Sequence, residues 1–101
     1  MGMDVYTENT DFGEIEDWEL DLIWERIVGR DGSIYFPLFS RIDPYGDARF
    51  PGGDVARLRA EVVQLQRETP PDGPVARMLG LLRRACDVAE AESAILYMFG
   101  D

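Results

Sequence analysis

Apolar residues recur at helical spacing in the second half of the chain. A helix is expected from Val55 to about Glu68, with Asp54 directly before it as the N-cap. The residues expected on its apolar face are Val55, Leu58, Val62 and Leu65. The T-P-P-D-G sequence at residues 69–73 predicts the end of this helix, because proline cannot continue its hydrogen bonds.

Pro74 suits the first turn of a second helix, which is expected to run to about Ala91. Its broad apolar stripe consists of Val75, Met78, Leu79, Leu82, Ala85, Cys86 and Ala89. Burial of this stripe is expected to supply much of the core. The following segment, Ala94 to Phe99, is apolar on both faces and predicts a closing strand that is covered on both sides.

The first half of the chain is less regular. Met3 to Tyr6 predicts a short strand, and Glu14 to Val28 fits two different periods. Apolar and acidic residues mostly alternate there, as in a strand with one buried face, but Leu20, Ile23, Trp24 and Ile27 also fit the face of a helix. We favour the strand, because the sequence G-R-D-G at residues 29–32 then supplies a hairpin turn into an apolar run, Ser33 to Phe39. Pro37 within that run indicates an edge position or a bulge.

These elements predict a single α+β domain spanning residues 1–101. Its small, mainly antiparallel sheet carries two helices packed on one face, in the order β(β)β-α-α-β. Residues 1–50 form an acidic N-terminal β region, residues 54–91 the helical pair and residues 94–99 the closing strand.

The charge is strongly one-sided. The chain has 20 acids and 10 bases, all arginine, and a net charge of −10. Residues 1–25 hold nine of the acids and no base, whereas the remainder is nearly balanced. Such a field repels nucleic acids and anionic membranes and attracts basic protein surfaces.

Several function classes are disfavoured. Without histidine there is no Ser–His or Cys–His pair and no imidazole ligand, and the single Cys86 cannot form an internal disulfide. No apolar run approaches the roughly 20 residues that span a bilayer. The acidic N-terminus does not resemble a signal peptide, so a cytoplasmic location is expected. We therefore expect a non-enzymatic protein without a cofactor.

The loop from Asp43 to Asp47, D-P-Y-G-D, is the first candidate site. Asp-Pro-x-Gly favours a tight turn, because proline presets φ and aspartate bonds the local backbone. Alternatively, Tyr45 between Asp43 and Asp47 would anchor a partner protein. Together with Asp54, the two aspartates could instead bind a hard cation and support a metal-dependent hydrolase.

The acidic N-terminal segment is the second candidate. The residues expected to contact a partner there are Glu14, Glu16, Asp17, Glu19 and Asp21. The alternative is a merely solvated sheet face, although mixed charges would solvate it with less repulsion. Trp18 and Trp24 are expected in the core, and either one, if exposed, would be a natural hot spot.

The segment from Pro37 to Asp47 has the pattern P-L-x-S-x-x-D-P-Y-G-D and continues to Phe50. In this stretch the chain resembles a group of small, largely uncharacterised bacterial proteins, some of which look like immunity proteins of toxin systems. The resemblance implies a protein partner and no catalytic residue.

We therefore expect a protein-binding module of the immunity or antitoxin type. It would occlude the basic surface of a partner, such as the phosphate-binding cleft of a nuclease toxin. The alternative is a small structural or regulatory protein, possibly a homodimer, whose acids serve only solubility.

Overall fold

The sheet has four antiparallel strands in the order β2-β1-β4-β3, so the first and last strands of the chain lie side by side at its centre. The computed structural model describes residues 2–28 and 31–100, without the side chains of residues 26–28. The strands are β1 (Gly2–Tyr6), β2 (Asp11–Glu16), β3 (Asp47–Phe50) and β4 (Leu96–Gly100). The helices are α1 (Asp17–Val28), α2 (Gly32–Tyr35), the 3-10 turn η1 (Phe39–Arg41), α3 (Gly52–Glu68) and α4 (Pro74–Glu92).

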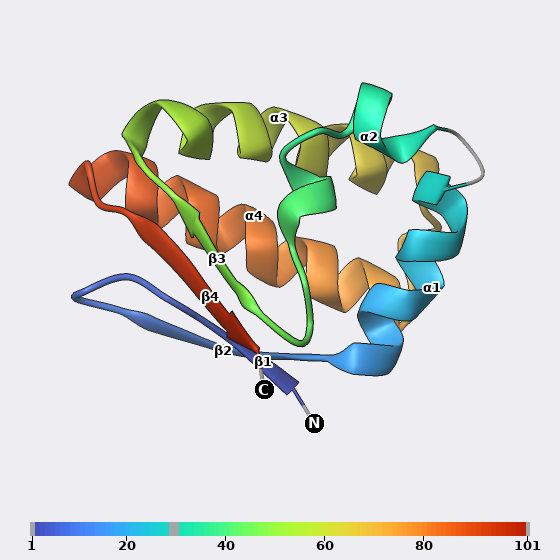
Figure 1. Ribbon diagram of the computed structural model, residues 1–101, viewed down its shortest axis with the longest axis horizontal. Helices are drawn as coiled ribbons and strands as arrows, with labels where there is room; N and C mark the ends of the chain where they lie inside the picture. The colour runs from blue at the N-terminus through green and yellow to red at the C-terminus, as the bar shows by residue number, and fades with distance from the viewer. Residues whose placement is uncertain (1, 29–30, 101) are drawn as a thin grey trace.

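The α+β fold is confirmed, with α3 and α4 packed together on one face of the sheet (Figure 1). The predicted stripe of α4 is buried from Met78 to Ala89, and Cys86 within it is fully enclosed. The predicted face of α3 is buried as well, because its four apolar residues repeat at the period of the helix. No helix in the described ranges is long and apolar enough to span a bilayer.

The start of α3 differs from the prediction. The helix begins at Gly52, and the residue in the N-cap position is Pro51, whose side chain accepts no hydrogen bond. Asp54 is therefore not the cap. It lies in the first turn, where its carboxylate is 3.6 Å from Arg57 and 3.5 Å from Arg41 and interacts favourably with the helix dipole.

The predicted strands at the two ends of the chain are confirmed as β1 and β4, but β4 is covered on one face only. Leu96 and Met98 point into the core, whereas Phe99 on the opposite face is 48% exposed. Apolar composition on both faces therefore did not mean burial on both faces. The uncovered face consequently displays aromatic rings.

The strand expected from Glu14 to Val28 is wrong after Glu16. Strand β2 ends there and α1 begins at Asp17, because Glu19 folds back so that its Oε1 accepts the Glu16 N–H at 2.9 Å. Leu20 and Ile23 are buried on the inner face of α1. From Asp17 onwards, the helical spacing of the apolar residues therefore describes the segment, and their alternation with acidic residues does not.

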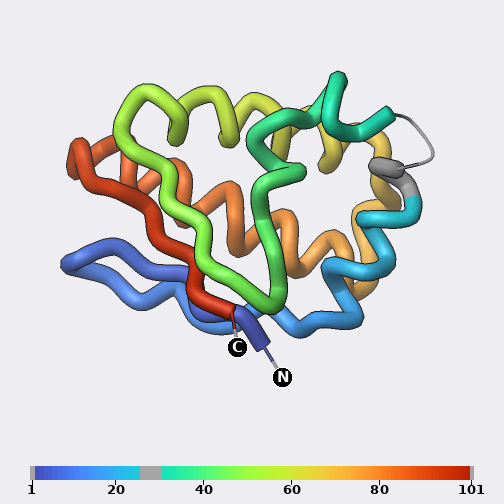
Figure 2. The backbone as a smooth tube through the Cα atoms, viewed as in Figure 1, coloured from blue at the N-terminus to red at the C-terminus, as the bar shows by residue number. Residues whose placement is uncertain are grey.

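The apolar run from Ser33 to Phe39 is not a strand either. It contains α2 and the start of η1, and Figure 2 shows this segment crossing from α1 towards β3. Pro37 has no N–H, and the N–H groups of Leu38 and Phe39 donate to the Glu61 carboxylate instead of a neighbouring strand. Two residues of the expected G-R-D-G turn, 29 and 30, lie outside the described residues.

Candidate protein-binding surface

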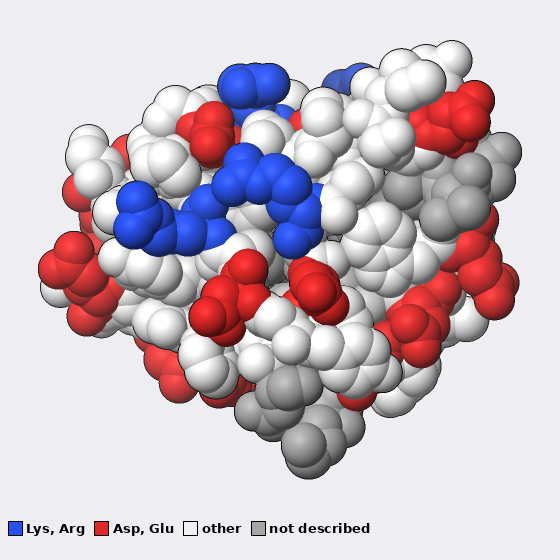
Figure 3. Space-filling model, in the orientation of Figure 1, with Lys and Arg blue, Asp and Glu red and all other residues white. Residues whose placement is uncertain are grey.

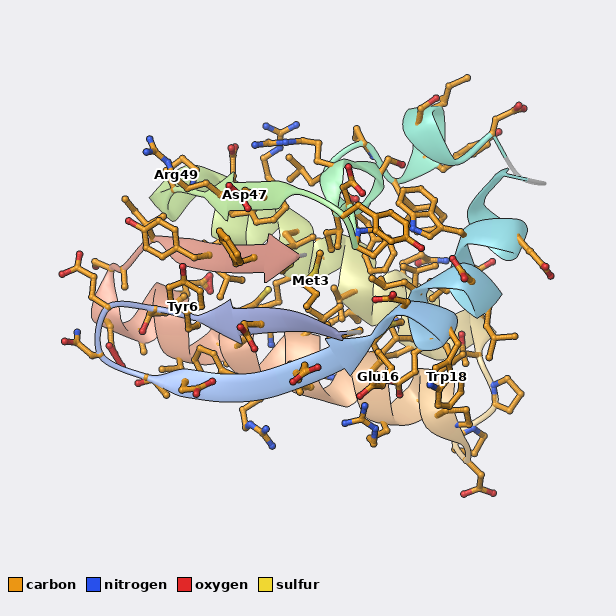
Figure 4. The ribbon with its side chains drawn as sticks, turned by 60° about the horizontal axis from the view of Figure 1, so that its bottom comes forward. Met3, Tyr6, Glu16, Trp18, Asp47 and Arg49 are labelled. Atoms are coloured by element: carbon orange, nitrogen blue, oxygen red, sulfur yellow. The ribbon has the colours of Figure 1, made fainter. Side chains whose placement is uncertain are left out.

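The face of the sheet opposite α3 and α4 carries side chains that alternate with the buried ones. On β1, Met3 and Val5 are buried, whereas Asp4 is exposed and Tyr6, the last residue of the strand, is half-buried. Figure 4 looks onto the sheet with the helices behind it, and Tyr6, Asp47 and Arg49 lie on its strands. The period of two along each strand thus builds this face.

The register joins these side chains into two rows across all four strands. The first row is Glu14, Asp4, Phe99 and Asp47. The second row is Asp11, Tyr6, Tyr97 and Arg49. We call these eight residues the acidic sheet face. A row of four strands spans about 14 Å at the usual strand spacing.

The three aromatic rings of the acidic sheet face lie on the central strands β1 and β4, where Asp4 accompanies them, and both edge strands carry charged side chains. Tyr6 and Tyr97 stack with ring centroids 5.4 Å apart and planes at 19°. Phe99 lies between Asp4 and Asp47 in its row. An apolar centre bordered by charge is the usual arrangement of a protein-binding patch.

The acidic character continues from β2 into α1. Glu16 and Trp18 lie next to each other where the strand meets the helix (Figure 4). Trp18 is 53% exposed and Leu22, one turn later, is 48% exposed. Trp18 was expected in the core and is instead at the surface, whereas Trp24 packs against the core near Phe39.

Carboxylates flank this exposed apolar pair on α1. Asp21 and Glu25 are exposed, and Asp17 is half-buried at the start of the helix. A hollow of about 190 Å³ opens beside Leu22, between α1 and the α3–α4 loop. The geometry therefore places Trp18 and Leu22 where a partner could bury them.

Glu19 does not belong to this surface. Its side chain is only 1% exposed, and its carboxylate binds the Arg77 guanidinium on α4 as well as the Glu16 N–H. The expectation that Glu19 contacts a partner is therefore wrong. A carboxylate this well buried is tolerated because a charge and a backbone donor compensate for the lost water.

The D-P-Y-G-D segment forms the predicted turn. Asp43 Oδ1 accepts the Tyr45 N–H at 2.9 Å, and the Asp43 carbonyl accepts the Gly46 N–H at 3.1 Å. Tyr45 is 72% exposed, and Asp47, the first residue of β3, belongs to the acidic sheet face. Of the two carboxylates of this turn, that of Asp47 therefore lies in the same row of the sheet as Glu14.

The metal interpretation of this region finds no geometric support. Asp43 bonds its own turn, Asp47 lies on the sheet, and Asp54 is paired with two arginines. Across the described ranges, no group of three or more Asp, Glu, Cys or His side chains could hold a metal ion.

Burial raises the pKa of the Cys86 thiol to about 12, so it is not an activated nucleophile.

Backbone groups on both edge strands are already bonded to side chains. On β2, the Gly13 N–H donates to Asp11 at 3.0 Å and the Glu16 N–H donates to Glu19. On β3, the Arg49 carbonyl accepts from the Arg41 guanidinium at 3.0 Å. These bonds oppose the addition of a strand from another chain at those three positions.

Arginines are distributed differently from acids. On the side of the molecule shown in Figure 3, basic side chains form one group towards the centre and others at the top edge, and acidic side chains lie on several sides of the central group. Arg41 is paired with Asp54 and lies over Phe50, with its guanidinium carbon 5.0 Å from the ring centroid. Arg49 is the single base in the two rows of the acidic sheet face.

Sequence reasoning missed six of the eight residues of the acidic sheet face. The residues not proposed as contact residues were Asp4, Asp11, Tyr6, Tyr97, Phe99 and Arg49. The local signal was the period of two within the two predicted strands, which places Asp4 and Tyr6 on one side of the first and Tyr97 and Phe99 on one side of the last. Their meeting with Asp4 and Glu14 depends on the long-range pairing of β1 with β4.

No family model, curated protein or solved structure matches this chain.

Proposed function

We propose that this protein is a non-enzymatic binding module of the immunity or antitoxin type, which occludes a basic surface of a partner protein. The observation that supports it most is the row Glu14, Asp4, Phe99 and Asp47, in which two candidate segments distant in sequence share one uncovered face. The resemblance around the D-P-Y-G-D turn adds to this support. The bacterial cytoplasm is the proposed location.

The mechanism has two stages. The carboxylates of the acidic sheet face and of α1 attract the basic surface and speed association. The aromatic rings of the sheet and Trp18 then lose their water against the partner and slow dissociation. Occlusion by this face would block any anionic substrate that uses the same basic surface.

The test begins with capture of the partner from lysate of the producing cell at low salt, followed by association kinetics with the purified partner. In the double variant Asp4→Asn/Glu14→Gln, the association rate is expected to fall by roughly three- to tenfold, because steering charge is lost. The salt dependence of the rate is expected to become shallower.

The matched control removes two exposed carboxylates from the helical side of the molecule. Asp31→Asn/Glu90→Gln changes the net charge equally, and asparagine tolerates the positive φ of residue 31. Equal slowing by both double variants would show that only net charge matters and would refute the proposed surface.

The alternative is a small homo-oligomeric protein. The observation that favours it is the exposure of Ile34 at 72% and Tyr35 at 65%, beside a hollow of about 330 Å³ between α2 and α3. If no basic protein is captured and sedimentation shows a dimer that Ile34→Asp dissociates, this alternative replaces the binding module.

A further inference from the structure

The acidic sheet face places carboxylates directly beside aromatic rings. Phe99 has Asp4 as its neighbour on β1 and Asp47 as its neighbour on β3. In the second row, Asp11 is paired with Tyr6, whose ring stacks on that of Tyr97. Directly opposed residues of antiparallel strands are close enough for one ligand group to contact both side chains.

A ring next to a carboxylate suits one cationic group better than others. The guanidinium of arginine is planar, stacks on aromatic faces and donates two parallel hydrogen bonds to a carboxylate. The lysine ammonium is a compact, strongly hydrated charge that gains less from the ring. A surface built only of carboxylates would not distinguish the two.

The chain itself contains an example of this arrangement. The Arg41 guanidinium lies 5.0 Å from the centroid of the Phe50 ring and 3.5 Å from Asp54 Oδ2. A guanidinium is therefore held here between an aromatic ring and a carboxylate, which is the environment that Phe99 offers with Asp4 and Asp47.

We infer that the acidic sheet face recognises its partner through arginine side chains, with a guanidinium stacked on Phe99 and paired with Asp4 or Asp47. This inference rests on the proposed function, since it names the chemistry of the same surface. Arg49 at the border of the face repels such a cation and limits where it can lie.

The test compares hexa-arginine amide with hexa-lysine amide, which carry the same charge, by calorimetry at low salt. Wild-type protein is expected to bind the arginine peptide about two- to fivefold more tightly, the ratio that a solvent-exposed cation–π contact supplies. In Phe99→Leu the ratio is expected to fall towards one, with little change for the lysine peptide.

The matched control is Tyr35→Leu, which removes an aromatic ring that is 65% exposed on α2, away from the sheet. It is expected to leave the ratio unchanged. Should Phe99→Leu fold poorly, amide chemical shifts of wild-type protein supply the readout. The arginine peptide should perturb residues 4, 47 and 99 more than residue 35.

The outcomes separate this inference from the proposed function. Equal affinity for the two peptides, or a preference that survives Phe99→Leu, overturns the role of arginine and leaves the acidic binding module standing. Absence of binding by either peptide contradicts both. The captured partner could associate more slowly with Asp4→Asn/Glu14→Gln while the two peptides bind with equal affinity. That combination would show that the surface binds basic partners without a preference for arginine.

Discussion

Glu61 on α3 holds the segment that leads into η1. Its carboxylate accepts the Phe39 N–H at 2.8 Å and the Leu38 N–H at 3.1 and 3.2 Å. Both donors belong to buried residues, so they would lack a partner without it. A single side chain thus replaces the strand neighbour that this apolar segment does not have.

Removal of this acceptor is expected to be costly. Glu61→Ala should lower the free energy of unfolding by about 2 kcal/mol, because two backbone donors lose their acceptor. Glu61→Gln should cost less, since the remaining Oε1 can accept both N–H groups. Denaturant unfolding followed by circular dichroism measures the difference, and equal losses in the two variants would contradict the capping role.

The pH dependence of the same residue has a definite sign. Burial raises the pKa of Glu61, against the opposing effect of the two backbone bonds. The folded state therefore keeps this proton to a higher pH than the unfolded state does. Its contribution to stability is present below the usual carboxyl range and is lost as the pH rises through the raised pKa. Wild-type protein should therefore lose stability relative to Glu61→Gln as the pH rises from below the usual carboxyl range through the raised pKa of Glu61.

At the scale of elements, two glycines with opposite surroundings show which contacts position the strands. A Cβ on Gly100, at the end of β4, would collide with the Pro44 carbonyl and lie 3.0 Å from the Gly46 carbonyl. The Gly100 N–H also donates to the Gly46 carbonyl at 2.8 Å. The turn before β3 is therefore packed closely against the end of β4. Gly80, in the middle of α4, has no such neighbour within 4 Å.

These surroundings predict opposite effects of the same substitution. Gly100→Ala should destabilise the protein by about 1–3 kcal/mol, because backbone must move to admit the methyl group. Gly80→Ala should stabilise it by about 0.5–1 kcal/mol through helix propensity. Thermal unfolding of the two variants checks this, and a stabilised Gly100→Ala would show that the turn is not held against β4.

The boundary between β2 and α1 shows how one residue decides the type of an element. The alternation of apolar and acidic residues from Ile15 to Trp24 fits a strand, yet the chain turns into a helix at Asp17. Glu19 makes the difference, because its bonds to the Glu16 N–H and to Arg77 on α4 fasten the first turn of α1. Arg77 is far away in sequence, so no local pattern contains this contact.

For the whole molecule, the charge excess has a cost for stability. A net charge of −10 on 101 residues makes the folded state repel itself, and salt screens this repulsion. The melting temperature is therefore expected to rise by on the order of 5 °C between about 10 mM and 200 mM NaCl. The rise should be smaller in Asp4→Asn/Glu14→Gln, which removes two of the repelling charges. A melting temperature that falls with salt would mean that ion pairs such as Arg59–Asp87 outweigh the repulsion.

Much of the helical layer could be predicted from the sequence. The buried apolar residues of α3 and α4 repeat with the helical period over many residues. This spacing is visible in the local sequence and does not depend on which other elements the helices contact. The turn at Asp43–Asp47 follows from proline and glycine in the same local way. Short segments without a long period, such as β3 and α2, carried no comparable signal.

The sequence by itself determined that this is a histidine-free, acidic α+β chain whose negative charge is concentrated in its first quarter, because composition and local periodicity do not depend on contacts. Only the tertiary structure decided which of those charges act together. The pairing of β1 with β4 brings Asp4 beside Phe99, and β3 adds Asp47 to the same row. The packing of α1 on α4 buries Glu19 and leaves Trp18 exposed. Strand register and helix packing join residues distant in sequence, and for that reason no window of sequence could show the surface they form.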